Sequence, residues 1–193
     1  MKTQQIMAGP SQLPLLRRDA DAVFARRDGS ELPVARFTRD AVSVSNRLPD
    51  STWYCNLCFD AYWFAVTFVA VAARGGKNLL PANQGAETLS SLSRNYPAAV
   101  WLTDRPTERA GISMLDMRLL ADDVADHSLA DIASEQLVAR VFTSGSTGLS
   151  AAIDKTWGEL SGAALANNEL LQKFIAAGDS VVSTVPPYHM SGL

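Results

Sequence analysis

Cysteine is scarce in this chain, with only two among 193 residues, so a disulfide scaffold is excluded. An excess of charge of one sign is also lacking, because 17 Lys and Arg stand against 20 Asp and Glu for a net charge of −3. A chain this near neutrality has no general electrostatic attraction for nucleic acid, and we expect no such partner. The hydrophobic share of 47% still predicts a globular chain with a substantial core.

Long hydrophobic runs are missing as well. The longest uncharged and mainly apolar run covers residues 61–73 and ends before Arg74, whereas a membrane span needs about 20 residues. The N-terminus has one Lys near its start but no apolar core of the kind that signal peptides carry. These absences predict a cytoplasmic protein with no membrane span.

Short strand-like and helix-like stretches alternate along the chain. Strands are predicted at 53–58, 78–81, 98–102, 137–142 and 181–185, and helices at 61–73, 87–94 and 157–177. Asp60 is a suitable N-cap for the first helix, and Gly75 and Gly76 stop it. Thr156 and Glu159 have the spacing of a capping box before the last helix. Strands alternating with helices predict an α/β fold, with a mostly parallel sheet and flanking helices.

Two stretches carry weaker patterns. The segment 17–40 mixes both signs of charge, which is typical of a solvated helix face rather than a binding patch. The segment 104–134 is polar and irregular, so we expect a surface connection with one helical piece.

A loop rich in Gly, Ser and Thr follows directly from the strand predicted at 137–142. Its residues are Thr143, Ser144, Gly145, Ser146, Thr147 and Gly148. Glycine lets the backbone turn tightly and bring N–H groups toward an anion, and hydroxyl groups add uncharged donors, so such a loop can cradle phosphate oxygens. It is neither a Walker A loop nor a dinucleotide-binding G-x-G-x-x-G turn. On composition alone, an ordinary flexible loop is the alternative.

These six residues resemble, position for position, the T-S-G-[ST]-T-G phosphate-binding loop of the adenylate-forming superfamily. Residues 186–192, which contain His189, resemble the P-x-[FY]-H-x-x-G motif of the same superfamily, and segments around 56–58, 75–76 and 79–81 resemble it more loosely. The superfamily includes acyl-CoA and aryl-CoA ligases, luciferases and the adenylation domains of peptide synthetases. The resemblance implies the first part of the large N-terminal domain of such an enzyme.

The resemblance also implies a two-step reaction. A carboxylate attacks the α-phosphate of ATP to give an acyl-adenylate and pyrophosphate, and the thiol of coenzyme A or of a carrier's phosphopantetheine then displaces AMP. By resemblance, residues 143–148 hold the β- and γ-phosphates beside Mg²⁺, and Thr143 also contacts the metal. His189 is expected beside the acyl pocket and the adenylate, as a positioning or gating residue of the active site. An aromatic or fatty acid is the expected substrate, and an acyl carrier protein is an alternative acceptor.

Two departures from the family pattern bear on activity. The family has Pro and Lys where this chain has Ser150 and Ala151, so the mobile charge that a loop Lys offers to phosphate is absent. Lys155 could replace it only in a different loop conformation. Family members are also much longer. We therefore expect residues 1–193 to be a partial N-terminal domain, without the remainder of that domain and the mobile C-terminal domain, and to be inactive alone.

A non-catalytic module that keeps the fold and binds a partner or itself is the alternative function. Ala151 and the missing C-terminal half favour it, and apolar surface left open by the truncation would promote a homo-oligomer.

Cys55 and Cys58 form a C-x-x-C pattern, for which a buried structural role is favoured over a redox or zinc site. A zinc site would need a second ligand pair, and the only histidines, His127 and His189, lie far away in the sequence. Trp63 and Trp101 are predicted to pack in the core.

Overall fold

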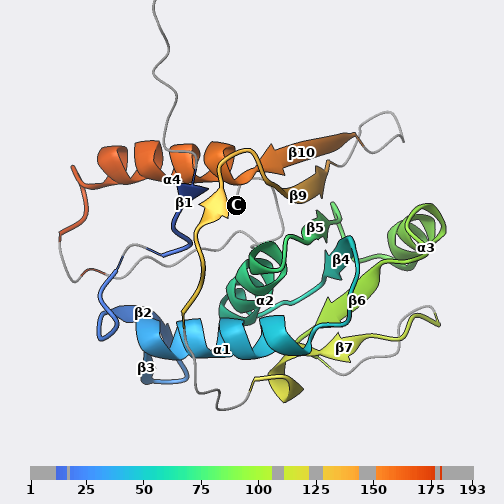
Figure 1. The fold of residues 1–193 in the computed structure, drawn as a ribbon, viewed down its shortest axis with the longest axis horizontal. Helices are drawn as coiled ribbons and strands as arrows, with labels where there is room; N and C mark the ends of the chain where they lie inside the picture. Colours follow the sequence, from blue (N-terminus) through green and yellow to red (C-terminus); the bar gives the residue numbers. More distant parts are fainter. Residues whose placement is uncertain are drawn as a thin grey trace, which may run out of the picture.

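The structure is a computed structural model that describes residues 12–16, 18–105, 111–121, 128–143, 151–176 and 179. Within them, the strands of the main sheet lie in the order β10-β9-β5-β4-β6-β7 (Figure 1). These strands are β4 (Trp53–Asn56), β5 (Lys77–Leu80), β6 (Val100–Thr103), β7 (Leu115–Asp116), β9 (Leu137–Phe142) and β10 (Ala152–Thr156). Every neighbouring pair is parallel except β10 and β9, so the predicted mostly parallel α/β fold is confirmed.

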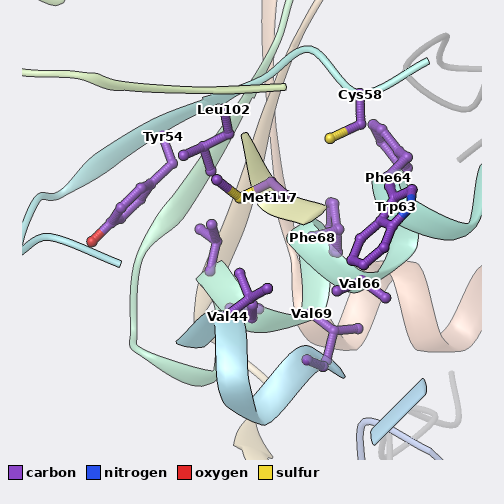
Figure 2. Close-up of a cluster of buried hydrophobic side chains, with 14 of the residues drawn as sticks. Val44, Tyr54, Cys58, Trp63, Phe64, Val66, Phe68, Val69, Leu102 and Met117 are labelled. Atoms are coloured by element: carbon purple, nitrogen blue, oxygen red, sulfur yellow. The ribbon is translucent and has the colours of Figure 1, made fainter. Parts of the chain in front are cut away.

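Helices cover the sheet on both faces. They are α1 (Val34–Arg47), α2 (Ala61–Ala73), α3 (Ala86–Asn95), α4 (Trp157–Leu171) and the short 3₁₀ helix η1 (Met117–Leu119). Tyr54, Leu80 and Leu102 pack in one cluster with α1 and α2, a part of which Figure 2 shows. Their strand neighbours Cys55 and Leu79 pack on the opposite face with Leu89 and Leu92 of α3. This division follows from the alternation of side chains along a strand.

Helix ends predicted from the sequence are largely confirmed. The side chain of Asp60 accepts a hydrogen bond of 3.1 Å from the N–H of Trp63 at the start of α2. Gly75 follows the end of that helix with a positive φ of 74°, and Thr156 with Glu159 forms a complete capping box at α4. However, α4 ends at Leu171, earlier than the predicted Ala177. The strand predicted at 181–185 lies outside the described residues.

The interpretation of segment 17–40 as a solvated helix face is wrong. The segment contains a hairpin of β2 (Val23–Arg27) and β3 (Ser30–Pro33), and only its end belongs to α1. Asp28 and Gly29 form the turn with positive φ values of 50° and 76°, as Asp-Gly does in tight hairpins. Asp40 is 2% exposed, since the face of α1 that carries it packs against α2.

Segment 104–134 is only partly the surface connection that we expected. The helical piece exists as η1, and residues 106–110 and 122–127, which include His127, lie outside the described residues. Met117 and Ile132 are buried, however. Ile132 belongs to β8 (Ile132–Ala133), which pairs with β1 (Gln12–Leu13).

Candidate functional site

The candidate phosphate loop leaves the main sheet at its carboxyl edge. Because β9 is parallel to β5, with Val141 opposite Leu80, Thr143 emerges at the same edge as the residues that follow β4, β5 and β6. This is the edge at which open α/β sheets bind their ligands. Ser144, Gly145, Ser146, Thr147 and Gly148 lie outside the described residues, as does His189.

The base of this loop is closed by the hairpin of β9 and β10. The N–H of Thr143 donates a hydrogen bond of 2.9 Å to the carbonyl oxygen of Ala151, and Phe142 lies opposite Ala152 in the next rung. Position 151 therefore closes the loop through its backbone. The side chain of Ala151 is exposed, so a longer side chain would extend into solvent there.

The strand β10 was not expected from the sequence, and it separates Lys155 from the loop. Lys155 lies opposite Ala139, at the end of the hairpin away from Thr143. Strands rise by about 3.3 Å per residue, which puts the backbone of Lys155 on the order of 10 Å along the strand from the loop base. Residues 152–156 have no alternation of apolar and polar side chains that would have indicated this strand.

One side chain ties this hairpin to the rest of the sheet. Arg140 of β9 donates to both carboxylate oxygens of Asp154 on β10, at 2.5 and 2.7 Å. It also donates to the hydroxyl of Tyr96 at 3.1 Å, and its guanidinium lies 4.7 Å from the ring centre of Trp53. The hydrogen bonds from Arg140 lower the pKa of Asp154 below its ordinary value, so this carboxylate stays charged at neutral pH. Arg140 and Asp154 are far apart in the sequence, so this ion pair could be expected only once the register of the hairpin was known.

A second carboxylate, at the carboxyl edge of the sheet, accepts hydrogen bonds from backbone N–H groups. Asp104 follows β6 and is 4% exposed. Its two oxygens accept hydrogen bonds from the N–H groups of Phe59 and Asp60, at 3.0 and 2.7 Å. Asp104 thereby holds the turn between β4 and α2, and its oxygens are already engaged by donors rather than presented to a cation.

The described ranges also contain the two cysteines and several acidic residues that could be considered as metal ligands or reactive thiols. No group of three or more His, Cys, Asp or Glu residues there could hold a metal ion. Cys55 and Cys58 are both fully buried, which confirms their structural interpretation, and burial raises the pKa of both thiols. Of the residues predicted to bind ATP or Mg²⁺, the structure describes only Thr143.

An apolar cavity of about 800 Å³ lies between α2, α4 and the segment around β1. Its lining includes the rings of Phe24, Phe37, Phe64, Phe68 and Trp157. Such a lining suits hydrocarbon rather than phosphate. The adjoining helix α4 has no fully buried residue, and its surface carries exposed Leu165, Leu170 and Leu171.

No described helix is both long and apolar enough to cross a lipid bilayer.

Comparison with known proteins identifies the fold. No family model matches the chain, and no curated protein matches it. Among solved structures, o-succinylbenzoate CoA synthetase (MenE) from Bacillus subtilis, in complex with the acyl-adenylate intermediate OSB-AMP, matches 86% of this chain with a TM-score of 0.67 and 17% identity. Apo MatB from Rhodopseudomonas palustris matches 85% with a TM-score of 0.66 and 18% identity.

The N-terminal subdomain of NpsA from Klebsiella oxytoca, in complex with 3-hydroxybenzoyl-AMSN, matches 70% of the chain with a TM-score of 0.57 and 14% identity. The matched regions cover 46% of the MenE chain and 37% each of the MatB and NpsA chains, so this chain spans less than half the length of these proteins. The sheet order and the flanking helices of the described residues are therefore those of the N-terminal domain of adenylate-forming enzymes, the superfamily that the motif beginning at Thr143 resembles.

Proposed function

We propose that this chain is part of an ATP-dependent acid–thiol ligase, which activates a carboxylic acid as its acyl-adenylate and transfers the acyl group to coenzyme A or a carrier-protein thiol. One observation carries the proposal: a loop with the sequence of an adenylate-forming phosphate loop begins at the carboxyl edge of a sheet that has the adenylate-forming fold. The complexes of similar proteins with ATP and magnesium or with an acyl-adenylate support the same class of chemistry.

The residues at the loop base are compatible with a bound nucleotide. The backbone N–H of Thr143 is used to close the loop, which leaves the donors of residues 144–148 for the β- and γ-phosphates in this proposal. The hydroxyl of Thr143 is the proposed ligand for Mg²⁺. That metal would spread the charge that develops as the carboxylate displaces pyrophosphate. His189 is proposed to position the acid and the adenylate.

A binding experiment tests this proposal. We expect calorimetry to detect MgATP binding to the intact gene product and to find weaker binding in a Thr143→Val variant. Thr52→Val is a matched control, because Thr52 is exposed and lies at the opposite end of the sheet, before β4. Pyrophosphate release with a panel of aromatic and fatty acids would then define the substrate. Equal binding by both variants, or none by the intact product, would contradict the proposal.

Self-association is a second candidate function, favoured by the surface of α4. Leu170 and Leu171 are 56% and 44% exposed, and Phe174 beyond the helix is 81% exposed. An apolar patch of this kind promotes association. Light scattering of the 193-residue chain should therefore show a dimer that Phe174→Ser and Leu170→Ser weaken. A monomer at all working concentrations would exclude this function.

A further inference from the structure

The side chain of Arg140, three residues before Thr143 on β9, connects three other elements of the fold. It meets Asp154 on β10 through two hydrogen bonds, Tyr96 at the end of α3 through one, and Trp53 of β4 through its ring face. Arg140 and Asp154 are also direct cross-strand partners in the register of β9 and β10. A bidentate guanidinium–carboxylate pair fixes orientation as well as distance.

The cluster of Arg140, Asp154, Tyr96 and Trp53 lies where it can influence the conformation of the loop. The strand β10 lies at one edge of the sheet, where β9 is its neighbour among the described strands. Its pairing within the sheet is therefore with β9, and the residues of β9 beyond Arg140 lead to Phe142 and Thr143, where the loop begins. The ring of Phe142 also packs at 6.2 Å against Tyr96, which already holds Arg140.

We infer that Arg140 is a positioning residue for the phosphate loop. Through Asp154 it sets the twist between the two strands that carry the loop. Through Tyr96 and Trp53 it ties that hairpin to the end of α3 and to β4. Its charge is matched by Asp154, and its backbone lies on the order of 10 Å along the strand from Thr143, so it acts on the loop backbone rather than on phosphate. The inference rests on the proposed function, since it assigns the loop a bound nucleotide.

A second Arg–carboxylate pair in this chain serves as a control for the pair of Arg140 and Asp154. In the hairpin of β2 and β3, Arg26 lies directly opposite Glu31 and donates to one carboxylate oxygen at 2.8 and 3.1 Å. That pair has the same chemistry across the same kind of hairpin, but the turn beyond it is Asp28-Gly29 rather than the candidate loop. Asp154→Asn and Glu31→Gln therefore remove equivalent charges at two hairpins, of which only one leads to the loop.

Two measurements on these variants test the inference. The first is hydrogen exchange at the amide of Thr143, which is bonded to Ala151 in the folded chain. The second is the dissociation constant for MgATP in the intact gene product. We expect Asp154→Asn to speed exchange at Thr143 and to weaken MgATP binding about fivefold, the size that a partly exposed ion pair can supply. We expect Glu31→Gln to change neither the exchange rate nor the dissociation constant. Arg140→Lys should keep only part of the parent's protection and affinity, since Lys cannot form the bidentate pair.

The outcomes separate this inference from the proposed function. If Asp154→Asn and Glu31→Gln give the same exchange rate at Thr143, the positioning role is overturned whether or not nucleotide binds. If the parent protein binds no MgATP, the proposed function fails, while faster exchange at Thr143 in Asp154→Asn would still show that the pair holds the loop base. Arg140→Ala serves as a further variant, with its unfolding temperature compared with that of Glu31→Gln.

Discussion

The hydroxyl of Tyr62 donates a hydrogen bond of 2.6 Å to Oδ2 of Asp40, and this bond joins α2 to α1 inside the core. Asp40 is 2% exposed and also accepts from Nε of Arg36 at 3.0 Å. Burial and the neighbouring carboxylate raise the pKa of Tyr62, so its hydroxyl remains a donor across the physiological range.

Replacement of Tyr62 by Phe tests the weight of this bond. The ring remains in place, but a buried carboxylate loses one of its partners, and we expect the free energy of unfolding to fall by about 1.5–3 kcal/mol. Tyr96→Phe is the matched control, because the hydroxyl of Tyr96 is bonded to Arg140 at a half-buried site. Urea unfolding should rank Tyr62→Phe well below Tyr96→Phe in stability, and equal losses would contradict this account.

Gly76 predicts a steric effect at the junction of α2 and β5. A Cβ at this position would lie 2.7 Å from Cε2 of Tyr54 and 3.0 Å from the carbonyl oxygen of Val71. Tyr54 is 1% exposed and cannot move without disturbing the core. Gly76→Ala should therefore destabilise the protein by about 1–3 kcal/mol.

Gly162 provides the opposite case within the same chain. It lies in α4, and apart from its chain neighbours and the backbone of its own helix, no atom of the described residues comes within 4 Å of the place that an added Cβ would take. Gly162→Ala should stabilise the helix by about 0.5–1 kcal/mol, because alanine loses less backbone entropy than glycine. Thermal unfolding of the two alanine variants should shift in opposite directions.

The C-x-x-C pattern predicts slow thiol chemistry. Cys55 and Cys58 are free and fully buried, and burial raises the pKa of both thiols, so little thiolate forms at neutral pH. Titration with an aromatic disulfide reagent should label the native chain slowly and the urea-unfolded chain at once. One fast thiol with a low pKa in the native protein would restore the redox interpretation.

Arg118 predicts a pH-dependent contribution to stability. It donates to Asp116 at 2.6 Å through Nη2, and its hydrogen bonds lower the pKa of Asp116 below the ordinary value of this carboxyl group. A carboxyl whose pKa is lower in the folded chain stabilises the fold above its unfolded pKa, and this stability is lost as pH falls through the folded value.

Arg118→Gln should therefore raise the pKa of Asp116, as measured by NMR titration of its carboxyl carbon. The free energy of unfolding of the variant should also fall less than that of the parent as pH falls from about 5 to below 4, because the variant lacks the stabilisation that Arg118 gives to the charged form of Asp116. Arg94→Gln removes an exposed charge in α3 and should leave the titration of Asp116 unchanged. An unchanged pKa in Arg118→Gln would show that this pair does not control Asp116.

Much of the architecture was predictable because short-range signals coincide with the elements. Asp60, Gly75 and the pair Thr156 and Glu159 mark helix ends through local hydrogen bonding or a positive φ. Charge patterning failed in 17–40, where the Asp28-Gly29 turn was the better signal. Charges alone do not report burial, and Asp40 is buried because Tyr62 and Arg36 lie beside it in the fold.

The motif of the candidate site was predictable from the sequence, but the side chains that hold the surrounding strands and turns in place were not. Residues 143–148 can be recognised from the sequence because they are consecutive and form one motif. The partners of Arg140 come from positions 53, 96 and 154, which only the sheet order and the hairpin register bring together. Asp104 likewise meets Phe59 and Asp60 only through the parallel pairing of β4 and β6.

Ala151→Lys tests whether the proposed nucleotide loop is weakened by the residue that it lacks. The side chain at 151 is exposed and its carbonyl closes the loop, so a Lys there can reach solvent without breaking the bond to Thr143. One added charge-assisted contact to a phosphate should strengthen MgATP binding by about three- to tenfold.

Ala166→Lys adds the same charge on the exposed surface of α4 and should leave the affinity unchanged. Calorimetry at two salt concentrations separates the effects, because a contact at the loop weakens with salt while a general charge effect would appear in both variants. If Ala151→Lys gains no affinity, the loop does not depend on a Lys at that position. A binding-competent loop of this composition would then rely on backbone N–H groups and hydroxyls alone.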